Sequence, residues 1–130
     1  MIYSSVYGED HPNTALEYAN AASVYADMGN REKAKELYAR SLATRKKVLG
    51  LVHPETAKDY FNIGTIWFDE GDNAQALAHF LTAYWLYEKM QHSQHQDALH
   101  VRKHLERVHT KLCIAEAFSD WLADLLKKRL

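Results

Sequence analysis

Cysteine, proline and glycine are all scarce in this sequence. Among 130 residues there are one cysteine, two prolines and five glycines. A single cysteine excludes a disulfide within the chain and is typical of a reducing compartment, so we expect a cytoplasmic protein. Proline does not occur after position 54 and glycine does not occur after position 71, so neither residue forces a break in the last part of the chain.

An excess of one charge sign and a long apolar run are also missing. The formal net charge is −1, which gives no field strong enough to attract nucleic acid or an acidic membrane surface. The most apolar stretch, 74–87, is interrupted by Gln75, His79 and Thr82. It is also shorter than the roughly 20 residues that a membrane span needs. We therefore expect neither nucleic acid nor membrane among the partners.

No group of residues indicates catalysis, a cofactor or a metal. His100 and His104 are four apart and share a helix face, so together they could hold one metal ion. The zinc-protease motif requires a Glu directly after the first of these histidines, but Val101 stands there. Cys113 is interpreted as a small residue in a buried turn and not as a nucleophile. The sequence thus predicts a protein that is not an enzyme.

An internal repeat is the strongest feature of the sequence. The segment 8–15, GEDHPNTA, recurs as GLVHPETA at 50–57, an offset of 42 residues. At the same offset further residues coincide in both copies, which indicates a structural repeat. The coinciding pairs are Tyr18 and Tyr60, Asn20 and Asn62, Asp27 and Asp69, Gly29 and Gly71, Ala34 and Ala76, and Lys47 and Lys89.

The repeated residues have recognisable roles in helical hairpins. Pro12 and Pro54 suit the first turn of a helix, and Gly29 and Gly71 suit the left-handed turn after one. The paired histidines before the prolines, His11 and His53, are expected to bond helix-end backbone groups. Asn30 and Asp72 are expected to cap the second helices, and small residues are expected where helices approach closely, namely Ala22, Ala34, Gly64 and Ala76.

The apolar residues recur at steps of three and four, which predicts an all-α protein of about six helices. Charged runs within it, Glu32-Lys33, Lys35-Glu36 and Arg45-Lys46-Lys47, are interpreted as solvated helix faces. We expect helices over 12–28, 31–49, 54–70 and 73–91, and a further helical pattern over 97–128. As one domain, 1–130, the chain divides into the end of a preceding helix (1–7), repeat 1 (8–49), repeat 2 (50–91) and a degenerate repeat 3 (92–130).

Two arrangements are open for the last segment. In the first, a helix over 97–112 turns near Cys113, and 115–129 packs back as a capping helix. The residues then facing inward are Ile114, Phe118, Trp121, Leu122 and Leu125. In the second, 97–129 is one long helix with a seam of apolar residues, and its second half needs a partner chain, which predicts a homodimer or a domain swap.

The pattern Gly-x-x-His-Pro-x-Thr-Ala, followed by an Asn five residues later and then a glycine turn, resembles the 42-residue tetratricopeptide repeats of kinesin light chains. The resemblance covers residues 1–91 well. It implies a helical-hairpin solenoid with a right-handed superhelix and a concave face lined by the first helix of each hairpin. It also implies a protein–protein interaction module, here a piece of a larger adaptor or scaffold.

The resemblance further implies where a peptide would bind. In peptide-binding members, an Asn on each first helix bonds the backbone or the terminal carboxylate of the peptide, and Asn20 and Asn62 hold that position. The alternative is that these two amides bond adjacent repeats to each other. The other residues expected on this face are Leu16, Ser23, Asp27, Lys58, Phe61, Thr65, Phe68, Asp69, His100, Lys103 and His104.

The leading functional hypothesis is therefore binding of an extended peptide or a partner helix along the concave face. One alternative is a structural or self-association segment that dimerises through 97–129. The other is a regulatory domain of a larger enzyme.

Overall fold

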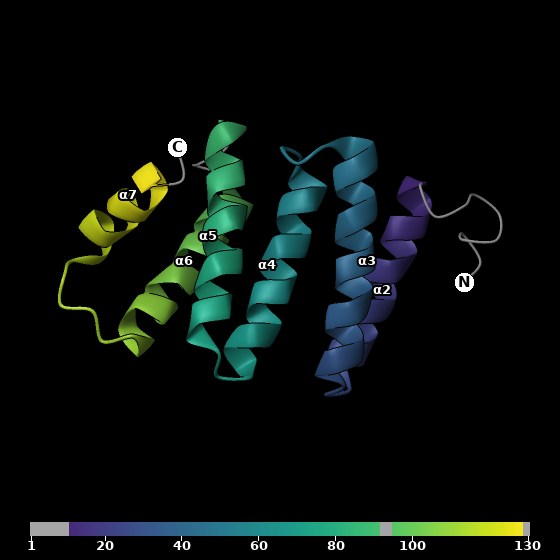
Figure 1. Cartoon of the computed structure of the whole chain (residues 1–130), viewed down its shortest axis with the longest axis horizontal. Coiled ribbons are helices and arrows are strands. Elements are labelled where there is room, and N and C mark those ends of the chain that lie inside the picture. Colours follow the sequence, from purple (N-terminus) through teal and green to yellow (C-terminus); the bar gives the residue numbers. More distant parts are fainter. Residues whose placement is uncertain (1–10, 92–94, 129–130) are drawn as a thin grey trace.

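The computed structural model describes residues 11–91 and 95–128, and every regular element in that part is an α-helix (Figure 1). The predicted all-α class is confirmed, while the helix end predicted for 1–7 lies outside the described residues. None of the described helices is long and apolar enough to span a membrane. The helices are α2 (Pro12–Asp27), α3 (Arg31–Leu49), α4 (Pro54–Asp69), α5 (Asn73–Lys89), α6 (Gln96–Lys111) and α7 (Phe118–Lys128).

Side chains at the helix starts explain why the helices begin where they do. His11, His53 and His95 each precede a helix, and the Nδ1 atom of each accepts a hydrogen bond from the backbone N–H two residues later, at 3.0–3.1 Å. Asn30 and Asp72 each accept one from the N–H three residues later, at 3.3 and 3.0 Å. These bonds satisfy donors that have no partner within the helix. The capping roles predicted from the repeat are thus confirmed.

Small residues allow the two helices of a hairpin to approach closely. Ala22, Ala34 and Ala76 are fully buried. Gly64 of α4 faces Phe80 of α5, and a Cβ atom on Gly64 would lie 2.7 Å from two carbons of the Phe80 ring. Only glycine fits at that contact without displacing the ring.

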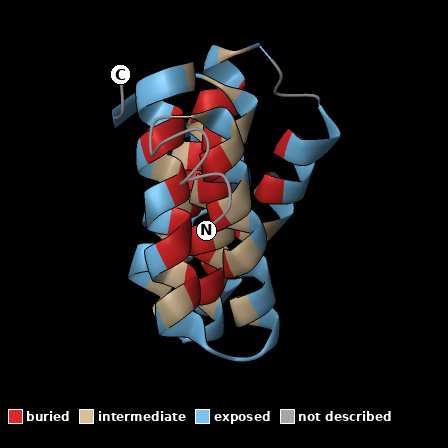
Figure 2. Ribbon diagram, turned by 90° about the vertical axis from the view of Figure 1, so that its right-hand side faces the viewer, coloured by how far each residue is buried: buried red, intermediate tan, exposed pale blue. Residues whose placement is uncertain are grey.

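The hairpins form a row in which each one packs against the next (Figure 1). α2 pairs with α3 and α4 pairs with α5, while α3 packs on α4 and α5 packs on α6. The residues coloured as buried lie on the sides of the helices that face one another, and the exposed residues lie on the outer sides (Figure 2). Among the first helices, α4 and α6 contact each other through the rings of Phe61 and His100, and α2 and α4 line one cleft. We call the surface made by their outward residues the first-helix face.

The C-terminal segment is a pair of helices and not one long helix. Between α6 and α7 the chain turns at residues 112–117, where Cys113 has a φ of 55°. Trp121 and Leu122 of α7 are buried in the same core as α5 and α6, so this chain itself covers them. Cys113 is exposed, and its predicted place in a buried turn is wrong. The other inward residues of α7 and its loop are partly buried against that core, namely Ile114, Phe118, Leu125 and Leu126.

Candidate functional site

A cleft of about 240 Å³ lies on the first-helix face between α2 and α4. It brings together five of the residues expected to contact a ligand. Because α2 and α4 hold equivalent positions in consecutive repeats, residues 42 apart in sequence face the same groove. The residues that line the cleft are Leu16, Ala19, Asn20, Ser23, Tyr38, Arg45, Glu55, Lys58 and Asn62.

The two asparagines of the cleft have free side-chain amides. Asn20 is exposed and Asn62 is half-buried, and neither side chain forms a hydrogen bond within residues 11–91 and 95–128. The alternative in which these amides bond adjacent repeats to each other is therefore not the arrangement in this structure. Lys58 is exposed at the same cleft and forms no ion pair with any described residue. Each side-chain amide has an NH₂ group that can donate and an oxygen that can accept, so both asparagines can form hydrogen bonds with a ligand in the cleft.

The floor of the cleft is a buried ionic network that sequence reasoning missed. The Arg45 side chain is only 4% exposed, and its guanidinium donates to Oδ1 of the fully buried Asp59 at 2.8 Å. The Ser41 hydroxyl donates to the other oxygen of Asp59 at 2.6 Å, and Arg45 lies 3.3 Å from Glu55. Burial raises the pKa of Asp59 to about 6, although Ser41 and Arg45 each lower it.

The interpretation of Arg45 as part of a solvated face is wrong. The spacing of residues in the sequence did indicate that Arg45 is buried. The buried side of α3 is formed at steps of four, three and four residues by Ala34, Tyr38, Ser41 and Arg45. The interpretation of Lys35 is also wrong. Its side chain is 14% exposed and forms an ion pair at 2.7 Å with Glu70, which directly follows α4.

The corresponding interface between α5 and α6 is apolar. The residues 42 positions after Ser41, Arg45 and Asp59 are Ala83, Tyr87 and Val101, and all three are buried. The same helix packing thus accommodates an ionic network at one interface and an apolar set at the next.

The α4–α6 level of the first-helix face is aromatic and basic. The Phe61 ring lies 5.1 Å from the His100 ring and 4.9 Å from the His104 ring, centroid to centroid. Nδ1 of His104 lies 3.0 Å from the carbonyl oxygen of His100, and burial lowers the pKa of His104. Lys103 is exposed beside His100 in a shallow recess, and the Arg107 guanidinium lies 4.8 Å from the centre of the Phe68 ring.

Three of the residues expected to bind a peptide belong neither to the α2–α4 cleft nor to the aromatic and basic residues of the α4–α6 level. The Thr65 hydroxyl donates to the carbonyl oxygen of Asn62 at 2.7 Å, so it is already bonded within α4. Asp27 and Asp69 are the exposed last residues of α2 and α4, and neither lines the cleft. Within the described ranges, no three His, Cys, Asp or Glu residues are placed to hold a metal ion.

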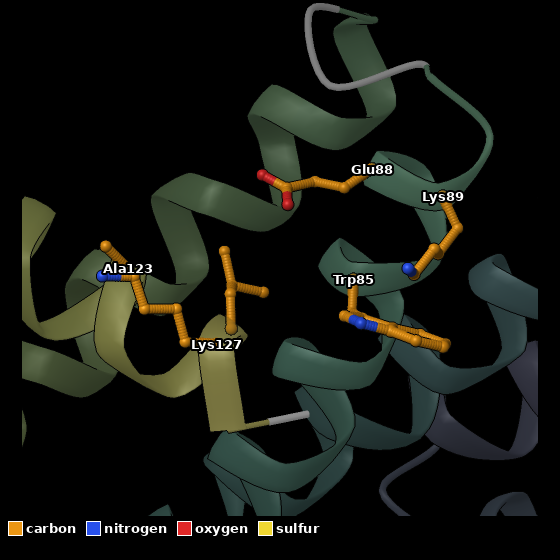
Figure 3. A pocket seen from close by; sticks show the side chains of 6 residues that line it. Trp85, Glu88, Lys89, Ala123 and Lys127 are labelled. Atoms are coloured by element: carbon orange, nitrogen blue, oxygen red, sulfur yellow. The ribbon is translucent and has the colours of Figure 1, made fainter. Parts of the chain in front are cut away.

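A larger recess of about 400 Å³ lies between α5 and α7, away from the first-helix face (Figure 3). The enclosed indole N–H of Trp85 has no hydrogen-bond partner in the structure as described. None of the residues expected to bind a peptide lines this recess. Those that line it are Trp85, Glu88, Lys89, Ala123, Leu126 and Lys127.

Comparison with known proteins agrees with the repeat architecture. The sequence model of the tetratricopeptide repeat matches residues 16–89, which is more than half of the chain. No curated protein sequence matches significantly. The fold is similar to the crystal structure of BtubC (BKLC) from P. vanneervenii, with a TM-score of 0.82 and 19% sequence identity over 98% of this chain. The chain spans 50% of the length of that protein. This chain therefore belongs to the tetratricopeptide repeat family.

Proposed function

We propose that the first-helix face binds an extended segment of a partner protein, with the α2–α4 cleft as its main contact. Repeats of this family mediate protein–protein interaction in general. The observation that carries the proposal is the pair of free amides, Asn20 and Asn62, on opposite walls of one cleft. An extended peptide exposes one N–H and one C=O per residue, and an amide side chain complements both.

The remaining lining gives the cleft both polar and apolar contacts. Leu16 and Ala19 provide apolar surface on the α2 wall, and Lys58 provides a cation on the α4 wall. Tyr38 and Arg45 form a floor that is held in place by burial. A rigid floor lowers the entropy that is lost on binding, because few side chains have to be ordered when the ligand arrives.

A bound segment that continues past the cleft reaches the α4–α6 level. There Phe61 offers an aromatic surface, and His100, Lys103 and His104 offer donors. Aromatic and basic side chains are frequent among residues that contribute most to binding. We expect the backbone of the partner to be held at the asparagines and its side chains to be selected at this second level.

The test is capture of partners on the immobilised 130-residue chain, followed by their identification. Asn20→Ala combined with Asn62→Ala is expected to reduce capture of the specific partner about tenfold or more, because two hydrogen-bond contacts are lost. Asn73→Ala combined with Gln75→Ala is the matched control, since it removes two amides from α5 on the other side of the stack. Equal loss in both double variants, or loss in neither, contradicts the proposal.

A further inference from the structure

The Arg45 side chain connects a buried carboxylate with the surface of the α2–α4 cleft. Its Nη1 atom donates to Oδ1 of Asp59 at 2.8 Å, and its Nη2 atom lies 3.3 Å from Oε2 of Glu55. Asp59 is fully buried, whereas the Glu55 side chain is 40% exposed. Arg45 and Glu55 both line the cleft, so a single guanidinium group separates Asp59 from a ligand bound there.

Packing of the hairpins does not explain why this ionic network is buried. The equivalent residues at the next interface, Ala83, Tyr87 and Val101, are buried without any charge. A buried ion pair gives little net stability compared with apolar residues of similar volume. The chain thus has an apolar way to stack its hairpins, and the charged one stands at the cleft that contains the free asparagines.

The surroundings of Asp59 accommodate both of its protonation states. The Ser41 Oγ atom lies 2.6 Å from Oδ2 of Asp59. A hydroxyl group donates to a carboxylate and accepts from a carboxylic acid, so a proton on Oδ2 only requires the Ser41 hydroxyl to turn. Oδ1 continues to accept from Arg45 in either state. Uptake of a proton therefore keeps these hydrogen bonds and removes one negative charge.

The charges at the cleft cancel when Asp59 is ionised. Arg45 and Lys58 are positive, and Asp59 and Glu55 are negative. When Asp59 is neutral, the cleft has an excess of one positive charge. Burial raises the pKa of Asp59 to about 6, helped by the negative charge of Glu55, so this change falls in the mildly acidic range.

The other groups around the network do not change charge in that range. Tyr38 of α3 also lines the cleft, and burial raises its pKa above the usual value. Tyr87 of α5 is close enough to Glu55 to be affected by its charge, and burial raises the pKa of this tyrosine to about 12. The α2 wall contributes no charged group, since its lining residues are Leu16, Ala19, Asn20 and Ser23.

We propose that protonation of Asp59 regulates the α2–α4 cleft, which binds a carboxylate group of its partner more tightly when Asp59 is neutral. In that state Arg45 is balanced only by Glu55, and an entering carboxylate pairs with Arg45 and Lys58. The inference rests on the function proposed above, because it concerns the same cleft. Binding and proton uptake are reciprocal, so a bound carboxylate also raises the pKa of Asp59.

NMR spectroscopy of the 130-residue chain tests the coupling without a ligand. The side-chain amides of Asn20 and Asn62 report on the two walls of the cleft, and the carboxyl carbon of Asp59 reports on its own proton. We expect all three signals to shift between pH 5 and 7.5 with a common midpoint at about pH 6. Asp59→Asn should remove this transition from the amides, and Asp120→Asn, the matched control on α7, should keep it.

Histidine titration in the same pH range is separated by the same variants. His53 caps α4 two residues before Glu55, where its Nδ1 atom accepts from the Glu55 N–H at 3.1 Å. Its titration is still present in Asp59→Asn, so only the shift that this variant abolishes belongs to Asp59. Amide signals that do not follow the carboxyl carbon of Asp59 overturn the proposal.

Binding is measured with N-acetylglycine, which combines a peptide group with a carboxylate that stays ionised at both pH values used. We expect it to bind about fivefold more tightly at pH 5.5 than at pH 7.5, because a full charge changes close to the ligand. N-acetylglycinamide, the uncharged counterpart, should show no such change. Asp59→Asn mimics the neutral acid and should bind N-acetylglycine at pH 7.5 as tightly as the parent chain does at pH 5.5.

A second variant covers the case that Asp59→Asn does not fold. Ser41→Ala with Arg45→Tyr and Asp59→Val introduces the apolar residues of the next interface, and its asparagine amides should show no transition near pH 6. The proposal is overturned if the parent chain binds N-acetylglycine equally at both pH values or at neither. It is also overturned if the pH dependence persists in these variants.

The capture experiment at pH 7.5 distinguishes failure of this inference from failure of the proposed function. Capture that is lost in Asn20→Ala with Asn62→Ala supports the function of the cleft, whatever the pH dependence is. A pH-independent affinity for N-acetylglycine together with that loss overturns only the role of Asp59.

Discussion

The buried network of Ser41, Arg45 and Asp59 allows a sharp prediction about what holds consecutive hairpins together. Asp59→Val alone would remove the carboxylate and leave Arg45, which is 4% exposed, without its closest partner. Removing one partner of a buried ion pair costs about 3–5 kcal/mol, because the remaining charge stays in the interior, here with only the 3.3 Å contact to Glu55. We expect the free energy of unfolding to fall by about that amount.

The triple variant Ser41→Ala, Arg45→Tyr, Asp59→Val should behave differently. It copies the residues that the chain itself uses 42 positions later, where Ala83, Tyr87 and Val101 are buried between α5 and α6. Replacing a buried ion pair by well-packed apolar residues is often neutral, or stabilising by about 1–4 kcal/mol. We therefore expect the triple variant to be at least as stable as the parent chain, although it carries the same Asp59→Val change.

Urea unfolding followed by circular dichroism measures both effects. With a slope of about 2 kcal/mol per molar urea, a loss of about 4 kcal/mol lowers the midpoint by about 2 M. If Asp59→Val alone unfolds the chain completely, a folded triple variant would still show that apolar residues can replace the ionic network. The reasoning is refuted if the single variant is as stable as the parent, or if the triple variant is no more stable than the single one.

Three further predictions concern pH, packing and capping. The folded pKa of Asp59 is about 6 and its ordinary value is 3.8, so the native state binds this proton more tightly than the unfolded state. The contribution of this group to stability is present below pH 4 and is lost as the pH rises to about 6, by up to about 3 kcal/mol. The difference in unfolding free energy between the parent and the triple variant should shift by that amount between pH 4 and 7.5. A difference that does not change with pH would contradict the raised pKa of Asp59. Gly64→Ala should lower the free energy of unfolding, measured in urea, by about 1–3 kcal/mol, because the new methyl group meets the Phe80 ring. A higher free energy of unfolding would show instead that the ring moves aside and that the helix propensity of alanine dominates. Asn30→Ala should cost about 1 kcal/mol through loss of the cap on α3, whereas Asn30→Asp should cost little, and equal losses in thermal unfolding would contradict the capping role.

Helix positions and hairpin pairing could be predicted because their signals are local. Pro12, His53 and Asp72 act on backbone groups within three residues, so their effect is independent of what packs around them. The predicted starts of α2 to α5 agree with the structure for this reason. The internal offset of 42 residues then places Asn20 and Asn62 at equivalent positions, and the structure brings them to one cleft.

The sequence by itself thus determined an all-α repeat, the ends of most of its helices and the face on which its asparagines lie. Only the tertiary structure decided that Arg45 is buried and that α7 packs back on its own chain. It also decided that Ile66 and Val108 are buried between neighbouring helices. The physical reason is that desolvation and packing depend on neighbours far away in sequence. The same helical pattern is compatible with water, with a charged partner or with another helix until the hairpins are stacked.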